Sequence, residues 1–247
     1  MKNRIWLGLL TALAILLNFR VSGQTNGVIT GITEPFLDVL LSAQASGTLR
    51  KQAFQEGDFV KKDQVILELD KTLEELAVER RKAVMDNLKT DLDGTRHLFK
   101  TTQSVSKDDL DKKELEYKVA VVDYDTALEQ LKRRQIIAPM DGFISDLLLD
   151  VGEDCKPQDP MVRLVETRRC HFVCHADARA GYDLKVGQKV ALEIEAGSKT
   201  VPVEGKIYYV SPVVDPASGL QKIKVLFENN DLKIRPGVPG KMRLPSS

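Results

Sequence analysis

The sequence predicts an α+β protein. A small β body, assembled from two separated segments, carries an inserted antiparallel helical hairpin and is followed by a small β-barrel. Three observations lead to this prediction. A charged stretch with heptad-like spacing covers residues 71–135, two similar glycine-containing segments flank that stretch, and short β-rich runs fill residues 167–247.

Residues 1–23 have the organisation of a targeting segment. Lys2 and Arg4 give a positive start, residues 5–17 are largely apolar, and residues 21–23 are small enough to suit cleavage. The apolar run is shorter than the ~20 residues that span a bilayer. It is predicted to be a cleaved signal peptide or a retained N-terminal anchor, and either role implies that the rest of the chain is exported.

The charge balance gives no support to one class of partner. The chain has 36 basic and 36 acidic residues and a formal net charge of +0, which gives no indication of nucleic-acid binding. Many of these charges fall in the predicted hairpin, where they are interpreted as the solvated surface of the helices.

Two helices are predicted within residues 71–135, separated by a polar break at residues 101–106. Ser106 and Asp109 have the spacing of a capping box that opens the second helix. Helices of roughly 30 residues make the hairpin about 45 Å long. Each helix is expected to contribute an apolar stripe to the seam between them. The first, looser stripe comprises Leu73, Ala77, Val84, Leu88, Thr95 and Phe99, and the second comprises Leu110, Tyr117, Val121, Tyr124, Leu128 and Leu131.

Residues 42–70 and 136–166 are predicted to be the two halves of one β body, preceded by a lead-in strand or linker at residues 24–41. A shift of 95 positions superimposes the two halves without a gap. Each half alone would expose an apolar face, so we expect the two to pack together as a sandwich. The shift also superimposes two pairs of glycines, which are assigned to structural turns: Gly47 with Gly142, and Gly57 with Gly152.

Residues 167–247 are predicted to form the barrel. Short β-rich runs separated by glycine and proline are typical of barrels and sandwiches. The runs cover residues 170–176, 189–195, 201–210, 220–227 and 240–244, with a short helix expected at residues 178–184.

The two β halves resemble a lipoyl/biotinyl domain cut in two, and residues 138–144 are similar to its strand-and-turn signature. A split lipoyl-like β-sandwich with an inserted α-helical coiled-coil hairpin and a following β-barrel resembles the membrane fusion proteins. These are the periplasmic adaptor subunits of tripartite efflux and secretion pumps in Gram-negative bacteria. The resemblance covers residues 36–244, and residues 184–188 and 232–237 are similar to recurring stretches of the family's barrel.

The resemblance implies a function without a catalytic, cofactor or metal site. It implies a periplasmic protein, associated with the inner membrane, that links an inner-membrane transporter of RND or ABC type to an outer-membrane channel. A homo-oligomeric ring, trimeric or hexameric, is also implied. The hairpin tip is similar to the channel-docking motif of resistance-pump adaptors, with a slightly shorter Arg-to-Ser interval. The channel contacts carried over from that motif are Arg96, Leu98, Ser106, Lys107 and Asp111.

Three other functions are considered. An exported structural coiled coil without a transport role is the alternative that the hairpin alone would support. A biotin- or lipoate-type carrier displays its modified lysine on the turn between the two halves, and here the whole hairpin replaces that turn. An enzyme needs a nucleophile with a base or paired carboxylates, and the sequence contains no recognisable motif of that kind.

The cluster Cys170-His171-Phe172-Val173-Cys174-His175 invites a zinc interpretation, but its composition predicts a strand. Two cysteines four positions apart on a strand lie about 13 Å apart, too far to share a metal or to form a disulfide. Both are therefore predicted to be small buried thiols. Cys155 is assigned to the core of the sandwich, and its pairing with a barrel cysteine is left open.

Overall fold

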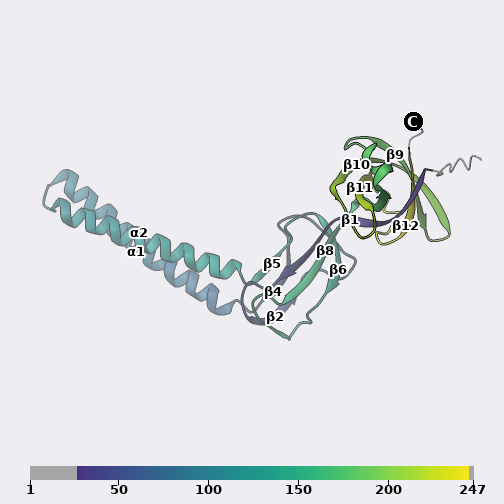
Figure 1. Cartoon of the computed structure of the whole chain (residues 1–247). Coiled ribbons are helices and arrows are strands. Elements are labelled where there is room, and N and C mark those ends of the chain that lie inside the picture. The colour runs from purple at the N-terminus through teal and green to yellow at the C-terminus, as the bar shows by residue number, and fades with distance from the viewer. Residues whose placement is uncertain (1–26, 245–247) are drawn as a thin grey trace, which may run out of the picture.

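The computed structural model describes residues 27–244 and shows an elongated molecule (Figure 1). The helical hairpin lies at one end, a β-sandwich in the middle and a β-barrel at the other end. This arrangement confirms the predicted fold class. The targeting segment predicted at residues 1–23 lies outside the described residues. Within the described part of the chain, no helix is long and apolar enough to cross a membrane.

The sandwich is built from strands on both sides of the hairpin. One sheet has the order β5-β4-β2-β7. Its strands are β5 (Gln135–Ile137), β4 (Val65–Leu69), β2 (Gly47–Gln52) and β7 (Asp154–Cys155). The facing sheet combines β3 (Phe59–Val60) and β6 (Gly142–Leu147) with parts of two long strands, β1 (Val28–Ser42) and β8 (Pro160–Asp177). The core between the sheets includes Leu49, Ile66, Leu69, Ile144 and Met161, so both halves contribute to it.

Equivalent backbone hydrogen bonds hold the two halves together. The Ala43 N–H donates to the Asp159 carbonyl at 2.9 Å, and the Ala138 N–H donates to the Gln64 carbonyl at the same distance. Each donor and each acceptor corresponds to the other under the shift of 95 positions. The sequence repeat is therefore a structural repeat, in which each half satisfies backbone groups of the other.

The four aligned glycines have two different roles. Gly57 and Gly152 lie in turns with φ of +88° and +102°. Gly47 and Gly142, which were predicted as turns, are instead the first residues of β2 and β6. A side chain at Gly47 would meet the Arg134 guanidinium at 2.7 Å, and one at Gly142 would meet the Val165 carbonyl oxygen at 2.8 Å. These two glycines allow close packing rather than a change of chain direction.

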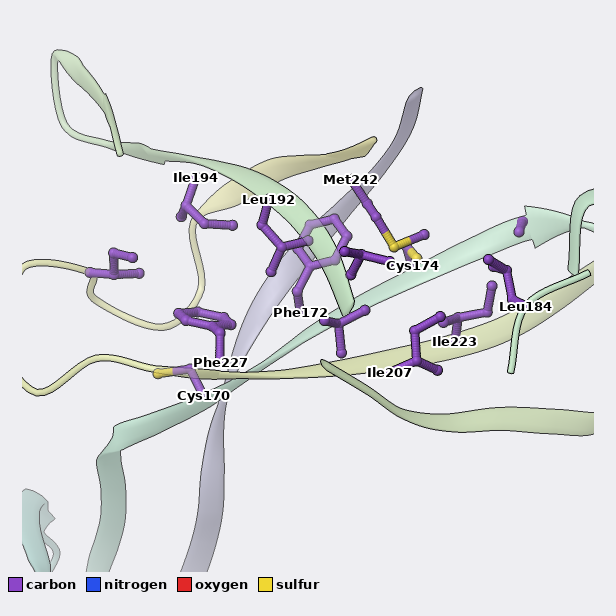
Figure 2. Close-up of a cluster of buried hydrophobic side chains, with 14 residues drawn as sticks. Cys170, Phe172, Cys174, Leu184, Leu192, Ile194, Ile207, Ile223, Phe227 and Met242 are labelled. Atoms are coloured by element: carbon purple, nitrogen blue, oxygen red, sulfur yellow. The ribbon is translucent and has the colours of Figure 1, made fainter. Parts of the chain in front are cut away.

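The barrel is a closed ring of strands in the order β1-β12-β9-β10-β11-β8, because β8 also pairs with β1. The additional strands are β9 (Lys189–Ala196), β10 (Lys199–Val214), β11 (Leu220–Glu228) and β12 (Pro239–Arg243), and the short helix is α3 (Ala178–Tyr182). Apolar side chains fill the interior, with Phe172, Phe227, Leu192, Ile194 and Met242 among the most buried (Figure 2).

Strands β1 and β8 run through both β domains, which differs from the predicted boundary between residues 166 and 167. Residues 28–35, expected in a lead-in segment, pair with β12 and β8 and complete the barrel. The pairing shifts register between Pro35 and Leu37, where one domain passes into the other. At this irregularity the Arg169 guanidinium lies 3.9 Å from the centre of the Phe36 ring.

The hairpin consists of α1 (Thr72–Thr101) and α2 (Lys107–Lys132), as the polar break predicted. Its seam differs in part from the expected stripes. Leu73 and Val84 were assigned to the seam, but they are 77% and 48% exposed. The fully buried positions are Leu92 on α1 and Ala120 and Ala127 on α2, none of which had been assigned to it.

The cysteine cluster lies on a strand, as expected from its composition. Cys170 and Cys174 point into the barrel core (Figure 2), and Cys155 lies in the sandwich core, so none forms a disulfide. Burial raises the pKa of Cys170 to about 11 and that of Cys174 to about 12. Within residues 27–244, no group of three or more His, Cys, Asp or Glu side chains is placed to hold a metal ion.

Candidate functional site

The free end of the hairpin is a short turn fixed by side-chain caps. Ser106 is the N-cap of α2: its hydroxyl accepts a hydrogen bond from the Asp109 N–H at 3.1 Å and donates to the Asp109 carboxylate at 2.7 Å. At the end of α1, the Thr102 hydroxyl donates to the Leu98 carbonyl at 2.9 Å. Gln103 between the helices has a φ of +51°. These caps satisfy backbone groups that a helix end otherwise leaves unpaired, so they define the shape of the tip.

Arg96 joins the two helices just below the tip. Its guanidinium donates to the Glu114 carboxylate on α2, with nitrogen–oxygen distances of 2.9 and 3.3 Å. Its side chain is 45% exposed, so the pair is partly open to solvent. Glu114 was absent from the residues inferred from sequence, because a cross-helix partner is visible only once the register of the hairpin is known.

The tip residues do not form one continuous patch. Leu98 is 45% exposed. It follows Arg96 by two positions, which places them about 200° apart around the helix. Lys107 and Asp111 are exposed, and they lie four positions apart on one face of α2. Ser106 is engaged in capping. Arg96 and Leu98 thus lie on different sides of α1, while the exposed charges of Lys107 and Asp111 lie on α2.

The opposite end of the hairpin is fixed to the sandwich by Arg134. Its guanidinium donates to the Glu74 carboxylate at the start of α1 and to the Ser46 carbonyl just before β2. The Arg134 and Glu74 side chains are only 22% and 17% exposed. One partly buried cation thus ties together both helices and the first half of the sandwich. Sequence reasoning did not single out Arg134, since a lone arginine after a helix has no distinctive pattern.

Together, a split lipoyl-like sandwich, an inserted hairpin with an ordered tip and a closed barrel define the architecture of a membrane fusion protein. Residues 38–166, about half of the chain, match the family described as "RND MFP, barrel-sandwich hybrid domain". The chain belongs to this family.

Individual relatives are distant in sequence. An uncharacterized protein of Haemophilus influenzae is 25% identical over 216 residues, which cover 87% of this chain and 56% of that protein. The antibiotic efflux pump periplasmic linker protein ArpA of Pseudomonas putida is 24% identical over 229 residues, covering 84% of this chain and 60% of ArpA. The chain thus spans 56–60% of the length of these two curated relatives.

One solved structure shows the likeness in fold. A MacA-MexA chimeric protein that contains the Pseudomonas aeruginosa MexA α-hairpin domain is similar with a TM-score of 0.76 at 20% identity. The match covers 87% of this chain and 76% of the chimera, so it includes sandwich, hairpin and barrel together.

Proposed function

We propose that this chain is a periplasmic adaptor that links an inner-membrane transporter to an outer-membrane channel for efflux or secretion. The observation that carries the proposal is the arrangement of the three parts: the hairpin and the barrel project from opposite ends of the sandwich (Figure 1). The hairpin tip and the barrel are therefore separated by at least the length of the hairpin, roughly 45 Å for 30 residues of helix. The efflux linker ArpA is among its relatives, which favours the same role.

The proposed role is assembly without catalysis. In this proposal the chain is associated with the inner membrane, its barrel faces a transporter of RND or ABC type, and its hairpin tip faces the channel. Several copies form a trimeric or hexameric ring. In such a ring, one surface patch of each copy binds a different patch of the next copy, and the assembly closes when the rotation between neighbouring copies allows it.

The proposed channel contacts are the tip residues Arg96, Leu98, Ser106, Lys107 and Asp111. Leu98 offers apolar area at a helix end, and an exposed apolar side chain contributes affinity when a partner covers it. Lys107 and Asp111 offer charges on the neighbouring helix α2, where they would favour one register over others. Ser106 would act by holding the turn in shape, because its hydroxyl is already engaged in the cap.

The test is purification of the tagged full chain from cross-linked cell envelopes. We expect an inner-membrane transporter and an outer-membrane channel to be recovered together with it. A Leu98→Asp variant should retain the transporter and lose the channel, because the substitution changes only the tip. Recovery of neither partner with the unaltered chain would refute the adaptor role.

A further inference from the structure

A groove lies at the point where the sandwich passes into the barrel. Its volume is about 460 Å³, within the range of roughly 300–1,000 Å³ that is usual for small-molecule sites. The groove is bounded by residues of β3, β6 and β8, and the last two of these strands run side by side in the middle of the molecule (Figure 1). No residue of the hairpin lines it, so it is separate from the proposed channel contacts.

The floor of the groove is apolar and partly open. Phe59 and Phe143 lie opposite each other on β3 and β6, with their ring centres 5.1 Å apart in an edge-to-face arrangement. Their neighbours Val60 and Ile144 belong to the sandwich core, so the two rings lie on the outer face of the sheet. Both rings are half-buried, and Leu37, which lines the same groove, is 41% exposed. A flat apolar molecule would cover this surface.

The rim of the groove has an excess of positive charge. Arg169 and Glu166 neutralise each other through two hydrogen bonds of 2.8 Å. The Asp141 carboxylate accepts a hydrogen bond from the Lys62 backbone N–H at 2.8 Å. The remaining charges on the rim are the Lys62 ammonium and the Arg168 guanidinium. Within residues 27–244, neither of these two cations takes part in an ion pair.

Arg168 is held over the aromatic floor. The central carbon of its guanidinium lies 4.4 Å from the centre of the Phe59 ring. Stacking of this kind uses the face of the guanidinium and leaves the N–H groups at its edge able to donate hydrogen bonds. The groove therefore places an oriented cation directly beside apolar surface. That combination suits a ligand with one flat apolar part and one anionic part.

We propose that this groove binds a small organic anion with an aromatic body. The body would lie against Phe59, Phe143 and Leu37. The anionic group would accept hydrogen bonds from the Arg168 guanidinium and the Lys62 ammonium, and hydrogen bonds between charged groups are the stronger kind. The excess positive charge of the rim disfavours a cationic ligand. This inference goes beyond the adaptor role and does not depend on it.

An acidic segment of a second copy of this chain is the competing occupant. A stable protein interface buries roughly 800 Å² on each partner, whereas the groove is a local hollow of about 460 Å³. Its size therefore favours a small molecule. The two occupants differ in one measurable respect, because a second copy would compete with a small ligand more strongly as the protein concentration rises.

The test is a titration of the full chain with naphthalene-2-sulfonate, followed by ligand-observed NMR. Naphthalene-2-sulfonamide is the matched neutral compound, with the same ring system and nearly the same size. We expect the sulfonate to bind about tenfold more tightly than the sulfonamide, and high salt to reduce that difference. Equal affinity of the two compounds would overturn the proposal. An affinity for the sulfonate that falls with rising protein concentration would assign the groove to a second copy and would also overturn it.

Three substitutions at exposed residues test the assigned contacts. Arg168→Gln should weaken binding of the sulfonate about fivefold, and adding Lys62→Gln should reduce it to the affinity of the sulfonamide. Asp141→Asn keeps an acceptor for the Lys62 N–H and removes a negative charge, so it should strengthen binding of the sulfonate about threefold. Circular dichroism checks that each variant is folded. Unchanged affinity in folded Arg168→Gln and Asp141→Asn would show that the anion does not bind here.

Arg235 provides the matched control. It is an exposed cation that lines a different cavity, and within the described part of the chain it has no ion-pair partner. Arg235→Gln should leave the affinity for the sulfonate unchanged. A loss as large as that of Arg168→Gln would indicate a general effect of net charge and would contradict a site in this groove.

Discussion

Gly57 and Gly152 are equivalent residues in the two halves of the sandwich, and each donates a backbone hydrogen bond into the other half. The Gly57 N–H reaches the Ile144 carbonyl and the Gly152 N–H reaches the Leu49 carbonyl, both at 2.8 Å. Both have left-handed backbones, with φ of +88° and +102°. The two turns thus lock together segments that lie on opposite sides of the hairpin in sequence.

Substitution at either turn should destabilise the sandwich through the backbone alone. A Cβ atom at Gly57 or Gly152 would meet nothing within 4 Å, so no collision adds to the strain. We expect Gly57→Val and Gly152→Val each to cost about 1–3 kcal/mol, or roughly 2–4 °C in Tm per kcal/mol for a chain of this size. Thermal unfolding followed by circular dichroism measures the effect.

Gly94 provides the control of opposite sign. It lies inside α1 with open space around its Cβ position and without a positive φ. Gly94→Ala should therefore stabilise the hairpin by up to about 1 kcal/mol. If the Val variants at Gly57 and Gly152 have an unchanged Tm, the strain assigned to the turns is absent.

Arg134 should determine how firmly the hairpin is attached. Arg134→Ala removes the partner of the Glu74 carboxylate, which is only 17% exposed, and leaves the Ser46 carbonyl without its donor. Loss of one partner from this partly buried charged pair is expected to cost about 1–3 kcal/mol. Hydrogen exchange should show faster opening at the start of α1 and in β2.

The neighbouring Arg133 is the matched control for that variant. It is exposed and makes no side-chain hydrogen bond in the described part of the chain. Arg133→Ala should leave exchange at the hairpin base unchanged. A Glu74→Ala change added to Arg134→Ala should cost less than the two single changes together, because the two side chains interact directly. Additive costs would contradict a direct interaction between Arg134 and Glu74.

Because its barrel thiols are buried, we expect the protein to lose stability at alkaline pH. Burial raises the pKa of Cys174 from 9.0 to about 12, so the native state keeps a proton that the unfolded state releases above pH 9. The free energy of unfolding should therefore be unaffected by this thiol below pH 9 and should fall as the pH rises from about 9 toward 12. Cys174→Ala should flatten that slope in urea titrations. At pH 8, alkylation of the folded chain should be slow and should accelerate on unfolding.

Sequence reasoning recovered what local pattern and repetition encode. The shift of 95 positions located both halves of the sandwich, and the Ser106 cap placed the start of α2. The prediction of the α1 seam was partly wrong because that helix has two interleaved apolar stripes. One includes Leu73 and Val84, the other Leu92, and spacing alone does not indicate which faces α2.

The other features that the sequence did not predict depend on contacts between distant residues. Arg96 with Glu114, and Arg134 with Glu74, form only after the hairpin has its register. The passage of β1 into the barrel was likewise not predicted. Pro35 marks the irregularity in the sequence, but the pairing of residues 28–35 with β12 and β8 depends on segments far along the chain.

Arg96 and Leu98 give the sharpest test of the tip as the channel contact. Leu98→Asp should abolish efflux or secretion while leaving Tm nearly unchanged, because the side chain is already 45% exposed. Arg96→Asp should do the same, but it also breaks the pair with Glu114.

The double change Arg96→Glu with Glu114→Arg separates the two roles of Arg96, since it restores the pair within the hairpin and reverses the charge that each helix presents. Continued loss of transport in the double variant would indicate that Arg96 meets the channel, whereas recovery would assign it to hairpin stability alone. Efflux measured in cells that lack the native gene, with the envelope level of each variant determined in parallel, decides between these results.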